Sequence, residues 1–322
     1  MFSGCKMCDV CLIVIFNHRY DKNLPILESM YRDRFTHRYY IVPFYDGDMD
    51  NVIPVYGRSI FFQGYIAQAA KIFIKEEFRH YLFVADDMII HPQINETNYR
   101  EFFEVKDGQS YISELRPLHE MGTFWIGTLS AVFYFKKQKY VEVASEIPPE
   151  EIATNLLKNQ GAMIRPLTRK EIFGNFSLNI HSLGNKARLL LRLLTRLRHP
   201  LQNTYKLPYP MVGSYSDILL VSSNSIKKFA HYCGVFSSTC LFAEVAIPTA
   251  LGLASSEKIQ VEKNMKRKGR AYWQGTGPFY YSDEYQWDNI EKEYKNLDDM
   301  MNRFPDSQLF IHPVKLSKWI NK

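Results

Sequence analysis

One segment near the start of the chain limits the folds that the chain can adopt. Val10 to Phe16 (VCLIVIF) is an unbroken run of apolar, largely β-branched residues, followed by the polar turn Asn17-His18-Arg19. A strand with one face in water alternates apolar and polar residues, whereas a strand buried on both faces does not. Strands of that kind belong to parallel sheets with helices on both sides. We therefore expect an α/β fold.

The following segments alternate between helix and strand patterns, as βαβ units require. They predict a single α/β domain over residues 1–322, with a mostly parallel central sheet flanked by helices. We expect strands at Tyr39 to Phe44, Tyr81 to Ala85, Trp125 to Phe135 (one or two), Tyr215 to Ser222 and Leu309 to His312, and helices at Asn23 to Tyr31, Phe61 to Phe78, after Pro149, at Ser225 to Cys233, Phe242 to Leu253 and Asp288 to Met301.

Composition and charge narrow the class of protein. With 322 residues, 46% of them hydrophobic, the chain can bury a large core. Its net charge of +6 is concentrated in a segment, 186–198, with five basic residues and no acidic one. This segment lies in a predicted helical, basic insertion at 165–210, and its leucines and arginines fit either an interfacial helix on anionic lipid or a helix packed on the core. No nucleic-acid-binding signature accompanies the charge, so we expect no nucleic-acid partner.

The cysteines and the chain ends indicate the compartment. Five cysteines is an odd number, and Cys5, Cys8 and Cys11 run into the predicted first strand, which argues against a disulfide framework. Their spacing would suit a metal only with a fourth ligand from elsewhere, so reduced structural cysteines are the simpler interpretation. No secretory signal or membrane-spanning run is evident. We expect a cytoplasmic protein, which would contact the membrane peripherally if 186–198 is the interfacial helix and not the one packed on the core.

Two adjacent carboxylates, Asp86 and Asp87, follow the predicted strand Tyr81 to Ala85. Carboxylates at the carboxyl end of a buried strand are well placed to hold Mg²⁺ or Mn²⁺, which prefer oxygen ligands and leave positions open for phosphate oxygens. Such an ion acts as a Lewis acid on a leaving diphosphate. The alternative is a helix cap or a solvated turn.

With this strand-terminal Asp-Asp pair, the chain resembles the GT-A glycosyltransferases in the order of its elements. The resemblance implies a nucleotide-sugar donor, with UDP favoured, and Mn²⁺ or Mg²⁺ held by Asp86 and Asp87. It also implies a later carboxylate as base and a histidine near the end of the chain. The donor would be bound by the loops after the first two strands and by charged residues near the metal: Asn17, His18, Arg19, Asp46, Asp86 and Lys315.

Two later positions match the remaining features. Glu244 lies among apolar residues at the start of a predicted helix, where burial would raise its pKa and suit it as general base in an inverting transfer. The alternative is a glutamate that stabilises the helix dipole, in which case Asp217 or a retaining mechanism would serve. His312 would be a further metal ligand and Lys315 would contact the phosphates, although a histidine at a strand end is often a surface residue.

These features predict a glycosyltransferase that moves a sugar from a nucleotide diphosphate donor to a glycan or lipid-linked acceptor. A nucleotidyltransferase is one alternative. Such an enzyme would be expected to have a glycine-rich loop after the first strand, where this chain has Asn17-His18-Arg19-Tyr20. A non-catalytic protein that binds the membrane face is the other alternative. A glycine-containing loop, 273–277, could close on the donor.

Overall fold

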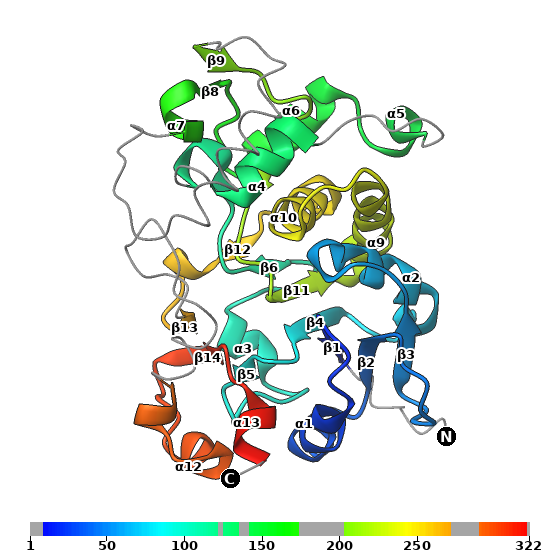
Figure 1. Cartoon of the computed structure of the whole chain (residues 1–322), viewed down its shortest axis with the longest axis vertical. Helices are drawn as coiled ribbons and strands as arrows, with labels where there is room; N and C mark the ends of the chain where they lie inside the picture. Colours follow the sequence, from blue (N-terminus) through cyan, green and yellow to red (C-terminus); the bar gives the residue numbers. More distant parts are fainter. Residues whose placement is uncertain (1–8, 122–124, 135–141, 174–202, 272–289, 321–322) are drawn as a thin grey trace, which may run out of the picture.

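A seven-stranded sheet forms the centre of the protein, in the order β12-β6-β11-β4-β1-β2-β3 (Figure 1). The structure is a computed structural model that describes residues 9–121, 125–134, 142–173, 203–271 and 290–320. Strands β3, β2, β1 and β4 are parallel, and β11 is antiparallel to both of its neighbours. The expected α/β class with a mostly parallel sheet is confirmed. The strands are β1 (Val10–Ile15), β2 (Arg38–Pro43), β3 (Val52–Val55), β4 (His80–Ala85), β6 (Tyr111–Ile112), β11 (Ile218–Ser222) and β12 (Gln260–Val261).

Strand β1 explains why the opening run is continuously apolar. Its alternate residues Cys11, Ile13 and Ile15 belong to one cluster of buried side chains, whereas the residues between them belong to a second cluster on the other face. All six side chains of the strand are buried. Since neither face meets water, no polar residue interrupts the pattern.

Helices cover both faces of this sheet (Figure 1). The first buried cluster joins the sheet to α2 (Gln63–Phe73), α9 (Ser223–Ser238) and α10 (Ala243–Ala254). The second cluster joins the opposite face to α1 (Leu24–Tyr31) and α3 (Tyr99–Phe103). The central sheet is therefore the middle layer of three.

A small second sheet brings the end of the chain back to the central sheet. Its order is β13-β14-β5, with β13 (Lys268–Ala271) parallel to β14 (Gln308–His312) and β14 antiparallel to β5 (Ile89–Ile90). Strand β5 follows β4 after a short turn, so its pairing with β14 carries the C-terminal segment to the carboxyl end of β4.

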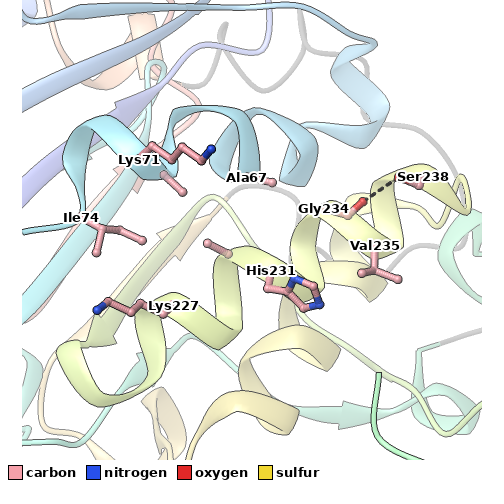
Figure 2. Close-up of a pocket in the computed structure, with 10 residues that line it drawn as sticks. Ala67, Lys71, Ile74, Lys227, His231, Gly234, Val235 and Ser238 are labelled. Atoms are coloured by element: carbon pink, nitrogen blue, oxygen red, sulfur yellow. Dashed lines mark hydrogen bonds between the residues drawn. The ribbon is translucent and has the colours of Figure 1, made fainter. Parts of the chain in front are cut away.

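Helices α2 and α9 pack closely and leave a groove between them (Figure 2). A Cβ atom on Gly234 would lie 3.2 Å from the Cβ atom of Ala67, so small residues permit this approach. The groove has a volume of about 600 Å³, and Lys71 and Lys227 lie on its two walls. None of its lining residues is acidic. The carboxylate chemistry expected from the sequence therefore lies elsewhere.

Three differences between the structure and the sequence-based expectation have a local physical reason. The segment from Trp125 to Phe135 is not a strand, because α4 (Ile126–Leu129) and a π-helical turn (Ser130–Tyr134) occupy the described part of it. Short apolar runs do not separate helix from strand, and here the Ser130 hydroxyl accepts a hydrogen bond from the Phe242 backbone N–H at 3.0 Å, which ties the segment to the start of α10.

The other two differences concern helix length. The helix expected over Phe61 to Phe78 ends at Phe73, because Ile74 is already extended. The acidic helix expected to reach Met301 is interrupted, since α12 (Leu297–Asn302) starts anew after Asn296, whose side chain accepts a hydrogen bond from the Asp299 N–H. Sequence periodicity predicts that these helices form more reliably than it predicts the residues at which they end.

Several expectations fall partly outside the described residues. The basic segment 186–198, the loop 273–277, Cys5 and Cys8 all lie there. The described parts of 165–210 form an antiparallel pair, β8 (Leu167–Thr168) with β9 (Thr204–Tyr205), and the short helix α7 (Arg169–Phe173). Cys11 is a buried cysteine in β1.

No helix in the described part of the chain combines the length and the apolar character needed to cross a membrane.

The central position of β1 yields a stability prediction. Ile13→Ala removes a fully buried side chain between two packed layers, so it should lower the free energy of unfolding by about 3 kcal/mol. Ile72→Ala is the matched control, because that side chain is 51% exposed, and its effect should stay within about 0.5 kcal/mol. Urea unfolding followed by circular dichroism measures both. Equal losses would contradict the three-layer arrangement.

Candidate active site

Asp86 and Asp87 lie where three strands of the central sheet meet. The Asp86 N–H donates to the Ile15 carbonyl of β1 at 3.0 Å, and the Ala85 N–H donates to the Asp217 carbonyl at 2.8 Å. Because β11 is antiparallel to β4, its first residues lie beside the carboxyl end of β4. Open α/β sheets bind ligands at this edge. The geometry thus gathers side chains from β1, β4 and β11.

Asp87 forms the central ionic contact of the site. Its Oδ1 atom lies 3.1 Å from Nε2 of His312, and Nζ of Lys315 donates to its Oδ2 at 3.0 Å. The Val314 N–H also donates to the Asp87 carbonyl at 2.6 Å. Burial opposes ionisation of Asp87, but His312 and Lys315 outweigh it and hold its carboxyl pKa well below the usual range. Burial likewise lowers the pKa of His312, and the Asp87 charge outweighs this and raises it.

Asp86 has a different environment from its neighbour. Its side chain is buried, and its carboxylate accepts hydrogen bonds from the backbone N–H of Asn17 and from the side chain of Asn23. Burial and the nearby charge of Asp87 raise its pKa well above the ordinary value. Asp86 is therefore bonded to the loop after β1 and to the start of α1 rather than to His312.

Asp87 and His312 have the separation expected of two neighbouring ligands of a metal ion. Ligands at right angles around an octahedral ion with bonds of about 2.1 Å lie about 3 Å apart, close to the 3.1 Å between Oδ1 and Nε2. Across the ranges that the structure describes, no three His, Cys, Asp or Glu side chains converge on one point. The site thus offers two protein ligands, and a divalent ion bound there would need phosphate oxygens and water to complete its shell.

Glu244 occupies the first turn of α10 on the other side of the site. Its carbonyl accepts a hydrogen bond from the Ser214 N–H at 3.0 Å, and its carboxylate accepts one from the side chain of Trp125. Burial raises the pKa of Glu244 to about 8, and the charges of Asp217 and Glu114 add to this rise. A carboxyl group with such a pKa can exchange a proton near neutral pH.

The segment Ser214 to Asp217 connects the two sides of the site. Besides the hydrogen bonds to Glu244 and Ala85, it carries Tyr215, whose ring meets the His312 ring edge-on with centroids 5.5 Å apart. Burial raises the pKa of Asp217, while His312 opposes this rise. Asp217 thus neighbours both Glu244 and His312. His312 in turn neighbours Asp87.

The predicted donor loop is only partly assembled. Arg19 forms ion pairs with Asp21 at 3.0 Å and with Asp46, which joins the loops after β1 and β2 at the same edge of the sheet. His18 is exposed and contacts Tyr20 edge-on. Arg19 and Asp46 are therefore brought together, whereas the ring contact of His18 is with Tyr20 and not with the carboxylates.

The sequence-based prediction gave no functional role to three residues of this site: Asn23, Trp125 and Tyr215. Tyr215 is the first residue of a predicted strand, and that position at the end of a strand was an available signal. Asn23 was assigned to a helix start, and Trp125 to a strand. Their contacts with Asp86 and Glu244 link distant parts of the chain, which periodicity does not reveal.

Comparison with known proteins gives no family: no protein-family profile matches the chain, and no curated protein sequence matches it.

The raised pKa of Glu244 predicts how stability varies with pH. Between its ordinary pKa of 4.5 and its folded pKa of about 8, the folded state holds the proton more tightly than the unfolded state. Its stabilising contribution is therefore fully present below pH 4.5 and is lost as the pH rises through 8. Glu244→Gln removes this titration, so the variant should gain stability relative to the wild type between pH 5 and pH 8.

Urea unfolding at several pH values measures this difference. The control is Glu146→Gln, at an exposed carboxylate that pairs with His231, for which we expect no such gain. A constant difference between wild type and Glu244→Gln across the range would contradict the environment described for Glu244.

Proposed function

We propose that this protein is a glycosyltransferase of the GT-A type, which moves a sugar from a nucleotide diphosphate donor, with UDP favoured, to a hydroxyl group of a glycan or lipid-linked acceptor. One observation carries the proposal: the Asp87 carboxylate at the carboxyl end of β4 contacts His312 and Lys315, and Asp217 interacts both with His312 and with Glu244, a partly buried carboxyl group whose pKa is raised to about 8. These groups suit a leaving diphosphate and an attacking hydroxyl, respectively.

The donor side of the site favours a diphosphate. Asp87 and His312 would hold Mn²⁺ or Mg²⁺, which when bound neutralises charge on the leaving diphosphate. Lys315 adds a positive charge next to Asp87, within reach of phosphate oxygens in the same space. Asp86 acts indirectly, because its bonds to Asn17 and Asn23 fix the loop that follows β1. The Arg19–Asp46 pair supplies polar groups for the nucleoside.

Glu244 is the group proposed to accept the proton. The acceptor oxygen forms a bond to the anomeric carbon while the bond from that carbon to the diphosphate oxygen breaks, and the electron pair leaves with the diphosphate. The hydroxyl proton passes to a carboxylate oxygen of Glu244. Direct attack of this kind inverts the anomeric configuration. A base is most effective when its pKa lies near the working pH, as burial and Asp217 provide for Glu244.

Binding and transfer experiments with two variants test this proposal. In calorimetry and thermal shift with UDP, GDP and CMP, the wild type should bind one nucleotide in the presence of Mn²⁺ and melt several degrees higher. Asp87→Asn should abolish the metal-dependent part of this shift, because it removes an anionic ligand. Glu244→Gln should bind the same nucleotide normally but transfer sugar about 10² to 10⁴-fold more slowly.

The two variants serve as controls for each other, since each changes one carboxylate to its amide. Circular dichroism spectra equal to the wild type ensure that a lost signal is not lost folding. Absence of binding to every nucleotide with and without Mn²⁺, or full transfer activity in Glu244→Gln, would overturn the proposal.

A further inference from the structure

The orientation of His312 depends on an aromatic residue outside the ionic cluster. Tyr215 is buried in the connection between β10 (Val212–Gly213) and β11, and its ring meets the His312 imidazole at an angle of 69°, with centroids 5.5 Å apart. Edge-to-face contacts at this separation are attractive and directional. The Nε2 atom of the same imidazole lies 3.1 Å from Oδ1 of Asp87.

A second aromatic ring, that of Phe310, packs against Tyr215. Its ring is parallel to the ring of Phe310, with an interplanar angle of 8° and centroids 6.0 Å apart. Phe310 lies on β14, two residues before His312, so both side chains point to the same side of that strand. The histidine and the phenylalanine therefore contact Tyr215 together.

The position of the Phe310 ring requires a glycine on the neighbouring strand. Gly269 of β13 pairs with Phe310, and a Cβ atom on Gly269 would overlap the phenyl ring. The overlap involves the ring atoms themselves rather than the end of a flexible chain, so any larger residue would displace Phe310. A chain of contacts thus runs from Gly269 through Phe310 and Tyr215 to His312.

The backbone on both sides of Tyr215 is also fixed to the site. The preceding residue, Ser214, donates its N–H to the Glu244 carbonyl, and the Asp217 carbonyl accepts the N–H of Ala85. The Tyr215 ring is therefore held relative to both α10 and the end of β4. Ordinary core packing would not require that a single ring contact the one imidazole that pairs with Asp87.

We propose that Tyr215, supported by Phe310 and Gly269, is a positioning residue that fixes the His312 imidazole against Asp87. The proposal rests on the proposed function in one respect, which is that His312 helps to hold a metal–nucleotide. The ring makes the contact with His312, whereas the hydroxyl interacts with Asp217, so Tyr215→Phe, which keeps the ring, should retain the positioning of the imidazole. Loss of such an outer partner of a ligating histidine typically weakens metal affinity 10 to 100-fold.

The first readout is the affinity for Mn²⁺ with UDP, measured by calorimetry. Tyr215→Leu and Gly269→Ala should each weaken it about 10 to 100-fold, whereas Tyr215→Phe should leave it unchanged. Tyr209→Leu is the matched control, because Tyr209 is also a buried tyrosine in contact with a phenylalanine, Phe236, and we expect no change in affinity. Affinity that is equal in Tyr215→Leu and the wild type would overturn the proposal, as would equal losses in Tyr215→Phe and Tyr215→Leu.

The second readout needs neither metal nor nucleotide. In ¹⁵N-histidine NMR spectra of the metal-free protein, with the His312 signals assigned through His312→Gln, the ring nitrogen signals of His312 should shift or broaden in Tyr215→Leu and Gly269→Ala. They should not change in Tyr215→Phe or Tyr209→Leu. If the wild type binds no metal–nucleotide, the proposed function fails while this comparison still decides the positioning role. Unchanged His312 signals in Tyr215→Leu would overturn it.

Discussion

The contact of Asp87 with His312 and Lys315 joins the two ends of the fold. It connects the turn that follows the central strand β4 with a segment 225 residues later in the chain. Burying charged groups costs free energy unless partners compensate for the lost hydration, and here each carboxylate oxygen has a cationic partner. The adjacent hydrogen bond from Val314 to the Asp87 carbonyl fixes the backbone as well. The second sheet, which carries His312, is held to the central sheet at this point.

This arrangement places carboxyl groups with lowered and with raised pKa values at one edge of the sheet. Asp87 is held ionised by its cationic neighbours, whereas burial keeps the proton on Asp86 and Glu244 to higher pH. Carboxyl groups whose environments separate their pKa values are suited to different roles in one reaction. In the proposed glycosyl transfer, Asp87 faces the donor diphosphate and Glu244 faces the acceptor hydroxyl.

The sequence predicted the central strands and the main helices because their patterns have a simple physical origin. Strands β1 and β4 are buried on both faces and therefore read as unbroken apolar runs. The segment after Trp125 was assigned wrongly, because its helical structure depends on packing against the start of α10. Such tertiary contacts are absent from local periodicity.

The same distinction applies to the site. The sequence singled out Asp87, Glu244 and His312 as candidates because each stands at the end of a strand or the start of a helix that periodicity predicts. The separate environment of Asp86 was not predicted, because it depends on contacts with Asn17 and Asn23 after β1. The proximity of His312 to Asp87 was expected only from the resemblance to glycosyltransferases, because it depends on how the second sheet docks. Tyr215 was missed for this reason too, because its neighbours Phe310 and His312 come from β14.

The most direct test of this account is an anomalous diffraction map at the manganese absorption edge, from crystals of the protein grown with Mn²⁺ and UDP. The account predicts one strong peak about 2.2 Å from a carboxylate oxygen of Asp87 and from Nε2 of His312, with the diphosphate beside it and Lys315 in contact with phosphate oxygen. A nucleotide bound without a manganese peak at this pair, or a peak at another place in the fold, would contradict it.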